Sequence, residues 1–237
     1  MLLIPFSHPE NSHHFSKIAT VKPLLKKPTP DHNDLKIYRT VSNIPFMSKI
    51  LEKVVLSQLV FHLDSNNFLS NVQSAYRPCH STETTLLKVV NDLLSALDSG
   101  KITVLTLLDL STAFDTTDHD ILLHRHQHVF GIHDAALLWF KSYLVYRTQI
   151  VSANGKYSSP VDLCYCVPQG SVLGPVVFIL YTQPLWSVLD QHPVSQQLYA
   201  DDTQIYKSSH PTDVEATIQG VERCISDNAP LYNYCIT

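Results

Sequence analysis

Two acidic positions in this sequence could hold metal ions for catalysis. Asp109 directly follows an apolar run at 102–108, and Asp201-Asp202 lie within YADDTQIY, between two short segments typical of strands. Two adjacent carboxylates at a turn repel each other, and no helix dipole relieves them, so we expect a positive group nearby. Mg²⁺ meets this need, because it takes oxygen ligands and is often held by one or two carboxylates plus substrate phosphates.

Metal-dependent phosphoryl transfer is the chemistry that such a site could perform. Two ions about 4 Å apart can activate an attacking hydroxyl and stabilise the leaving oxygen of an in-line displacement. A lone Asp-Asp pair, however, is more often part of a solvated turn. From these carboxylates alone, both a metal site and a solvated turn therefore stay open.

A second group of potential ligands is the run His124, His126 and His128. His124 and His128 are one helical turn apart, a spacing that can bind zinc. No further ligand constellation accompanies them, so a solvated helix face is the favoured interpretation. The five cysteines are an odd number without a CxxC pair, which argues against both a disulfide framework and a zinc ribbon.

Two helices and a strand are expected before Asp109. Apolar residues recur at helical spacing over 45–63 and 82–97, and Ser81 is suited to cap the second helix. The continuous apolar run at 102–108 is typical of a strand that is buried on both faces. Asp109 is therefore expected at the end of such a strand.

Three further helices are expected after Asp109. Asp118 can cap a helix over 119–129, and Asp134 can cap another over 135–145. A third helix is expected over 175–189.

Strands are expected between and after these helices. Asn154-Gly155, flanked by segments 148–153 and 156–163, is the strongest short signal for a β-hairpin. Two short strands at 197–200 and 203–207 surround the Asp-Asp pair. Helices come first and are followed by strands mixed with helices, an order that indicates an α+β fold.

The composition is that of an ordinary globular chain. Of its 237 residues, 44% are hydrophobic and 16% are charged. The net charge of −4 counts against nucleic-acid binding by the whole chain, although a basic patch can be local. No apolar run reaches the roughly 18 residues of a membrane span, so no membrane partner is expected. Basic residues do cluster early, at Lys17, Lys22, Lys26, Lys27, Lys36 and Arg39.

Three segments in a fixed order carry a resemblance to a known family: LLDLSTAFD, VPQGSVLGP and YADDTQIY. They resemble the three central palm motifs of reverse transcriptases. Four further segments are similar to those of LINE-type (non-LTR) retrotransposons: LEKVVLSQL, QSAYRPCHSTETTLL, ALLWFKSYLVYRTQ and FILYT. The resemblance implies an α+β fold of fingers and palm, in which a small, mainly antiparallel palm sheet packs on helices.

The resemblance also implies which residues form the catalytic centre. Asp109 and Asp201 would hold two Mg²⁺ ions, for which Mn²⁺ could substitute, and Asp202 would be the neighbouring acid. Leu110 would offer its backbone carbonyl. Phe114 would close on the sugar of the incoming dNTP and exclude a 2′-hydroxyl, whereas without the motif it would be interpreted as a core aromatic.

Four further residues would bind substrate by the same resemblance. Gln169 and Gly170 match the segment that lines the nucleotide and template pocket, where glycine lets the backbone approach a ligand closely. Arg39 would bind the triphosphate, since guanidinium suits phosphate, and Arg77 would contact the template or pack the fingers. The implied partners are an RNA template, a DNA primer and dNTPs.

Three positions depart from the family pattern. Thr40 replaces a proline after Arg39, His126 stands where the family has leucine, and Cys166 stands where it has glycine. A glycine at 166 would permit a φ that cysteine resists.

The expected domains are a leader over 1–20, a fingers and palm domain over 21–208, and a divergent, truncated tail over 209–237, with the thumb missing. The implied function is RNA-directed DNA polymerase. The alternative is a catalytically inactive remnant that serves at most as a nucleic-acid- or protein-binding module.

Overall fold

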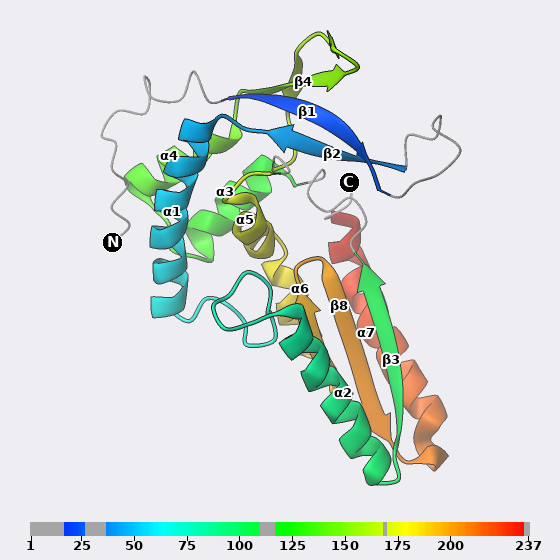
Figure 1. Cartoon of the computed structure of the whole chain (residues 1–237). Coiled ribbons are helices and arrows are strands. Elements are labelled where there is room, and N and C mark those ends of the chain that lie inside the picture. The colour runs from blue at the N-terminus through cyan, green and yellow to red at the C-terminus, as the bar shows by residue number, and fades with distance from the viewer. Residues whose placement is uncertain (1–16, 27–36, 110–116, 168–169, 235–237) are drawn as a thin grey trace. The chain divides into compact units, whose positions relative to one another are not determined.

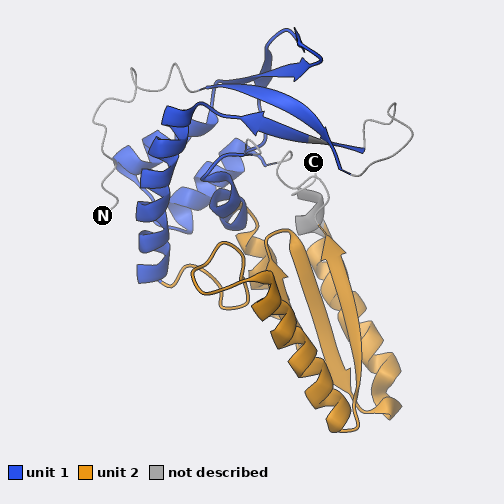
Figure 2. Ribbon diagram, in the orientation of Figure 1, with its two compact units in different colours: residues 1–66, 117–180 blue, residues 67–116, 181–237 orange. Residues whose placement is uncertain are grey.

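The computed structural model describes residues 17–26, 37–109, 117–167 and 170–234 (Figure 1). The chain divides into two compact units, each formed by two stretches of sequence (Figure 2). Unit 1 comprises residues 1–66 and 117–180, and unit 2 comprises residues 67–116 and 181–237. All three candidate metal-binding aspartates belong to unit 2.

Unit 1 contains a five-stranded sheet. Its strands are β1 (Ile18–Leu25), β2 (Tyr38–Asn43), β4 (Arg147–Ala153), β5 (Lys156–Tyr157) and β6 (Val161–Leu163). β1 pairs antiparallel with β2 and parallel with β4, which also pairs with β5 and β6. The hairpin predicted at Asn154-Gly155 is confirmed, since both residues have positive φ, at 50° and 75°, as a type I′ turn requires.

The helices of unit 1 are α1 (Phe46–Ser65), α3 (His119–His128), α4 (Asp134–Leu144) and the start of α5 (Gly174–Tyr181). Asp118 caps α3 as predicted, because its side chain accepts hydrogen bonds from the N–H groups of Asp120 and Ile121. The predicted Asp134 cap is wrong. His133 occupies the N-cap position of α4 without a side-chain cap, and Asp134 is the first helical residue.

The single helix predicted over 175–189 is also wrong, since two helices share this stretch. α5 ends at Tyr181, and α6 (Gln183–Leu189) begins with Pro184 in its first turn. Proline lacks an N–H group and its ring clashes with the carbonyl of the preceding turn, so it starts helices and interrupts continuous ones. Apolar residues occur on both sides of the break, so their distribution in the sequence does not reveal it.

Unit 2 is built on a three-stranded antiparallel sheet in the order β3 (Ile102–Asp109), β8 (Asp202–Ser209), β7 (Ser195–Tyr199). It also contains α2 (Thr82–Asp98), α6, the short helix η3 (Pro211–Asp213) and α7 (Val214–Tyr234). This sheet and its helices confirm the α+β class and the small antiparallel palm sheet. The stretch expected as a divergent tail forms η3 and α7 within the described residues.

α2 and α7 lie on opposite faces of this sheet (Figure 1). The hydroxyl of Tyr206 on β8 donates to Asp92 of α2. The ammonium group of the next residue, Lys207, lies beside Gly220 of α7. Successive side chains of a strand point to opposite faces, so each helix covers one of them. Asp202 and Tyr206 are four residues apart and therefore share the face on which α2 packs.

The expectation that the strand before Asp109 is buried on both faces is wrong. β3 is an edge strand, and the side chains of Leu105 and Leu107 are 42% and 68% exposed. The central strand is β8, whose Ile205 and Tyr206 are both buried. In the described part of the chain, no helix is both long and apolar enough to cross a membrane.

Candidate active site

Asp109, Asp201 and Asp202 are brought together by the register of the unit 2 sheet. Asp109, the last residue of β3, pairs directly with Asp202, the first residue of β8. Asp202 in turn pairs with Tyr199 of β7, so that Ala200 and Asp201 alone connect the two strands. The expectation that Asp109 ends a strand is therefore confirmed, and the sheet places it beside the Asp-Asp hairpin.

Asp201 and Asp109 act electrostatically on Asp202. The pKa of Asp202 is raised, first by partial burial and then by the negative charges of Asp201 and Asp109. The pKa of Tyr76 is also raised, by burial first and then by Asp201 and Tyr199, so this phenol faces the same negative region. Among the described residues, no Lys, Arg or His forms an ion pair with any of the three aspartates.

This uncompensated negative charge fits a divalent cation. Within the described residues, no three His, Cys, Asp or Glu side chains already form a set that could hold a metal ion. Mg²⁺ does not need such a cage, because it usually binds one or two carboxylates and completes its shell with water and substrate phosphates. Asp109 with Asp201 or Asp202 meets that requirement.

Arg77 is engaged with its own loop. One terminal nitrogen of its guanidinium donates to the backbone carbonyls of Ser70 (2.8 Å) and Gln73 (3.2 Å). Of the two roles expected for Arg77, template contact or packing, these bonds support packing. A contact between Arg77 and the template stays a prediction.

Gly170 is required by its own backbone. Its φ is +102°, and a Cβ atom there would lie 2.6 Å from the carbonyl oxygen of Ser42 on β2. Side chains essentially never fit such a contact, so only glycine is compatible with the way this turn packs on β2. The close approach thus involves a strand of unit 1, and an approach to nucleotide stays a prediction.

Sequence analysis missed Glu52, which supports the same turn. Its carboxylate is 1% exposed and accepts hydrogen bonds from the Ser171 hydroxyl (2.7 Å) and the N–H groups of Val172 (2.6 Å) and Leu173 (3.3 Å). The signal was present in the sequence. Glu52 lies in phase with the buried residues Val55 and Leu59 of α1, where a charge must have partners.

Leu110, Phe114 and Gln169 lie outside the described residues. Arg39 contributes its backbone to the β1–β2 ladder opposite Leu24, and its side chain lies outside the described part.

The histidine run separates into two environments. His124 and His128 are exposed, with ring centroids 4.3 Å apart, whereas His126 is fully buried on the other side of α3. The solvated face is thus confirmed for two of the three. Among the described cysteines, Cys79, Cys164 and Cys224 are free thiols.

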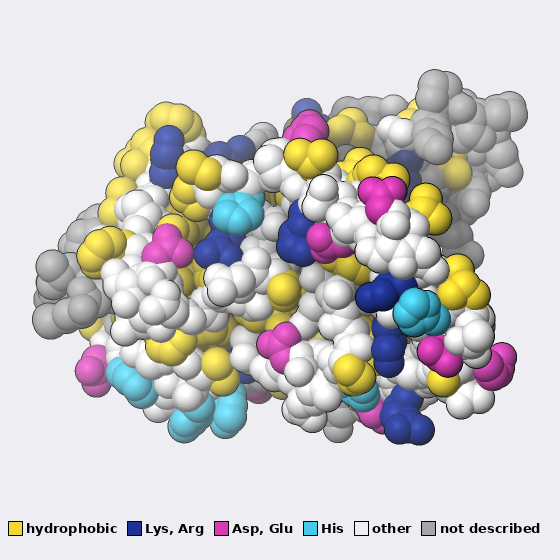
Figure 3. Space-filling model, turned by 90° about the horizontal axis from the view of Figure 1, so that it is seen from below, with side chains coloured by type: hydrophobic (Ala, Val, Ile, Leu, Met, Phe, Trp, Pro, Cys, Tyr) yellow, Lys and Arg dark blue, Asp and Glu magenta, His cyan; other side chains and the backbone are white. Residues whose placement is uncertain are grey.

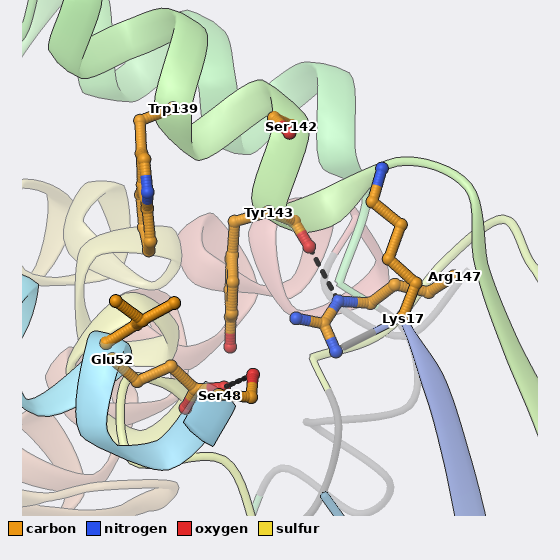
Figure 4. A pocket seen from close by; sticks show the side chains of 8 residues that line it. Lys17, Ser48, Glu52, Trp139, Ser142, Tyr143 and Arg147 are labelled. Carbon is orange, nitrogen blue, oxygen red and sulfur yellow. Dashed lines mark hydrogen bonds between the residues drawn. The ribbon is translucent and has the colours of Figure 1, made fainter. Parts of the chain in front are cut away.

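A small pocket in unit 1 is too narrow for a nucleotide. It has a volume of about 10 Å³, room for a single water molecule, and Figure 4 shows its lining side chains. The Arg147 guanidinium stacks on the Tyr143 ring at 4.4 Å and donates to the Tyr143 carbonyl. Figure 3 shows Lys, Arg, Asp, Glu and His side chains on one face of the molecule.

Comparison with known proteins gives one family. The reverse transcriptase (RNA-dependent DNA polymerase) family matches residues 25–231. The RNA-directed DNA polymerase from mobile element jockey of Drosophila melanogaster is 33% identical over 191 residues, which are 78% of this chain and 21% of the relative. The probable RNA-directed DNA polymerase from transposon X-element of the same species is 29% identical over 215 residues, 89% and 23% respectively. The chain thus spans about a fifth of these relatives.

Solved structures show the same fold at low sequence identity. Apo telomerase from Candida tropicalis, truncated from its C-terminal domain, has a TM-score of 0.61 and 14% identity, covering 95% of this chain and 49% of that one. Telomerase from Candida albicans in complex with a fragment of telomeric RNA has a TM-score of 0.58 and 10% identity, covering 90% and 40%.

Proposed function

The chain belongs to the reverse transcriptase family, of the LINE type, and on this premise we propose that it has the site of an RNA-directed DNA polymerase. The reaction is transfer of a nucleotidyl group from a dNTP to the 3′-hydroxyl of a DNA primer on an RNA template. The observation that carries the proposal is the pairing of Asp109 with Asp202 beside Asp201, where none of the three forms an ion pair with a described residue.

Asp109 and Asp201 would hold two Mg²⁺ ions, with Asp202 as the neighbouring acid. Bound Mg²⁺ supplies Lewis acidity to the attacking and leaving oxygens of an in-line displacement. The contribution of the protein is to position the carboxylates. The ladder between β3 and β8 fixes the backbone of Asp109 against that of Asp202, so their carboxylates do not have to be ordered separately when substrate binds.

The substrate contacts belong to the same proposal. Arg39 would bind the triphosphate, Gln169 and Gly170 would line the nucleotide and template pocket, and Phe114 would exclude a 2′-hydroxyl. These roles are supported by the family match, which includes all four positions. Arg77 would act through the loop that its guanidinium holds.

Primer extension tests the proposal. The purified chain is incubated with an RNA template, an annealed DNA primer, dNTPs and Mg²⁺, beside the Asp201→Asn variant. We expect extension by the unsubstituted chain alone. If a folded chain that binds the primer–template does not extend it, the polymerase proposal fails for this chain and the inactive, nucleic-acid-binding remnant replaces it.

A further inference from the structure

The turn that carries Asp201 has an unfavourable backbone. Ala200, the first residue of the turn, has a φ of +58° and is 8% exposed. In this left-handed region the Cβ atom of an L-residue crowds the backbone, and glycine or asparagine is the usual occupant. A non-glycine residue keeps such a conformation only where its surroundings enforce it.

The side chain of Gln73 contacts this turn. It is fully buried, and its Oε1 accepts hydrogen bonds from the N–H groups of Ala200 (3.2 Å) and Ala75 (3.0 Å). A carbonyl oxygen has two lone pairs, and both are used here. One bond fixes the turn between β7 and β8, and the other fixes the loop from which Gln73 comes.

That loop is itself anchored to β7. Leu198 donates from its N–H to the carbonyl of Val72 and accepts from the N–H of Ser74, each at 2.9 Å, in a parallel bridge. The Gln197 amide nitrogen adds bonds to the Val72 carbonyl (2.8 Å) and the Ser74 hydroxyl (2.7 Å). The loop that carries Gln73 is therefore held against β7, and Gln73 contacts the turn from this fixed position.

The Nε2 group of the Gln73 amide indicates that packing alone does not explain a glutamine at this position. Its Nε2 is buried and has no hydrogen-bond partner among the described residues. A buried donor without a partner is costly, so packing alone would favour an apolar side chain here. A glutamate would supply the acceptor without this donor, but it would add a negative charge beside three aspartates. Glutamine is the residue that supplies a neutral acceptor.

We propose that Gln73 is a positioning residue of the active site, which holds Ala200 in its left-handed conformation and thereby sets the orientation of Asp201 and Asp202. The proposal rests on the proposed function, because it assigns those carboxylates to Mg²⁺.

Replacing Gln73 by Met tests the proposal through two measurements. Methionine keeps the length of the side chain and removes the acceptor. We expect the amide hydrogen of Ala200 to exchange with solvent at least about tenfold faster by NMR, while amides in the centre of β8 keep their rates. We expect the Kd for Mg²⁺, titrated alone, to rise about tenfold, equal to about 1.4 kcal/mol.

A second substitution separates positioning from general stability. Glycine adopts positive φ without the Cβ penalty. Ala200→Gly in the Gln73→Met background should therefore return the Mg²⁺ affinity to within about twofold of the unsubstituted chain. The matched control is Gln197→Met, which removes bonds to the same loop but none to the turn. It should lower the melting temperature and leave the Mg²⁺ affinity unchanged. Gln73→Asn, which keeps an amide but shortens its reach, replaces the Met variant if that variant does not fold.

Two results would overturn the proposal: unchanged exchange of the Ala200 amide in the Gln73 variant, or an equal loss of Mg²⁺ affinity in Gln197→Met. If the unsubstituted chain binds no Mg²⁺, the proposed function fails, and the exchange of the Ala200 amide still decides whether Gln73 holds the turn.

Discussion

Asp109 and Asp202 face each other as direct partners in the antiparallel ladder between β3 and β8. Like charges directly opposite each other destabilise a sheet. Asp201 lies next in the chain and adds its negative charge, so the end of this sheet accumulates repulsion that the described residues do not offset with an ion pair. A cation bound there would convert this repulsion into attraction.

The first prediction concerns the coupling between these two carboxylates. Burial, Asp201 and Asp109 together raise the pKa of Asp202. Asp109→Asn removes one of the two negative charges, so the pKa of Asp202 should fall. An NMR titration of the side-chain carboxyl carbons measures it. Asp98→Asn, at the far end of α2, is the control and should leave the Asp202 titration unchanged.

The second prediction concerns Asp201. Because its side chain stands at a two-residue turn and takes no part in an ion pair of the described structure, Asp201→Asn should leave the fold intact. It should abolish primer extension and weaken Mg²⁺ binding at least about tenfold, since a neutral amide is a poor ligand for a hard cation. Circular dichroism and a Mg²⁺ titration check both parts. An unfolded variant, or an unchanged Mg²⁺ affinity, would show that Asp201 has another role.

Local signals in the sequence were sufficient for most elements of this fold. Asn154-Gly155 predicted its hairpin and Asp118 its cap, because both act within a few residues of chain. The position of β3 in its sheet could not be predicted in this way. An apolar run does not show whether a strand lies at the centre or at the edge of its sheet. In this chain that position depends on the pairing of β8 with distant segments.

The same difference between local signals and contacts of distant segments applies to the residues of the candidate site. The sequence motifs indicated Asp109, Asp201 and Asp202, since motif residues carry the chemistry. Gln73 and Glu52 were missed, because each accepts hydrogen bonds from backbone N–H groups more than 100 residues away. Gly170 was identified, but its contact with Ser42 depends on the packing of β2, which no sequence pattern records.

The third prediction follows from the backbone of Cys166. Its φ is +83°, and its N–H donates to the Thr117 carbonyl while its carbonyl accepts from His119. Cys166→Gly should raise the free energy of unfolding by about 1 kcal/mol, because glycine relieves the strain at a modest cost in chain entropy. Chemical denaturation measures it. Cys164→Gly, at a position without positive φ, should instead lower stability.

The fourth prediction is a pH dependence of stability caused by His126. Its ring is fully buried among Phe130 and Phe140, and burial lowers its pKa from 6.5 to about 4, an effect that the backbone of Leu122 partly opposes. Between pH 6.5 and pH 4, the His126 ring binds a proton in the unfolded chain but stays neutral in the folded chain. Stability should therefore be lost as the pH falls from 6.5 to 4, by up to about 3 kcal/mol.

Replacing His126 by Leu should remove this loss and also stabilise the chain at pH 7, since both ring nitrogens are buried and have no well-formed hydrogen bond within the described residues. Denaturation series at pH 7 and pH 5 for the two chains give the comparison. His124→Leu, on the exposed face of α3, should leave the pH dependence as it was. If the free energy of unfolding falls equally between pH 7 and pH 5 in the unsubstituted chain and in His126→Leu, His126 does not cause the pH dependence.

The last prediction separates two reasons for a glycine at position 170. Gly170→Ala combines a φ of +102° with a Cβ atom 2.6 Å from the Ser42 carbonyl oxygen, so β2 or the turn must move. Gly155→Ala has a φ of +75° and no atom within 4 Å of the new Cβ, so only the backbone conformation is affected. We expect Gly155→Ala to cost about 1 kcal/mol of stability and Gly170→Ala at least about 2 kcal/mol. Primer extension adds the functional comparison: Gly170→Ala should reduce it strongly, because the moved turn is joined to Gln169, whereas Gly155→Ala should preserve it. If the two variants are equally stable, the contact between Gly170 and Ser42 does not constrain the fold.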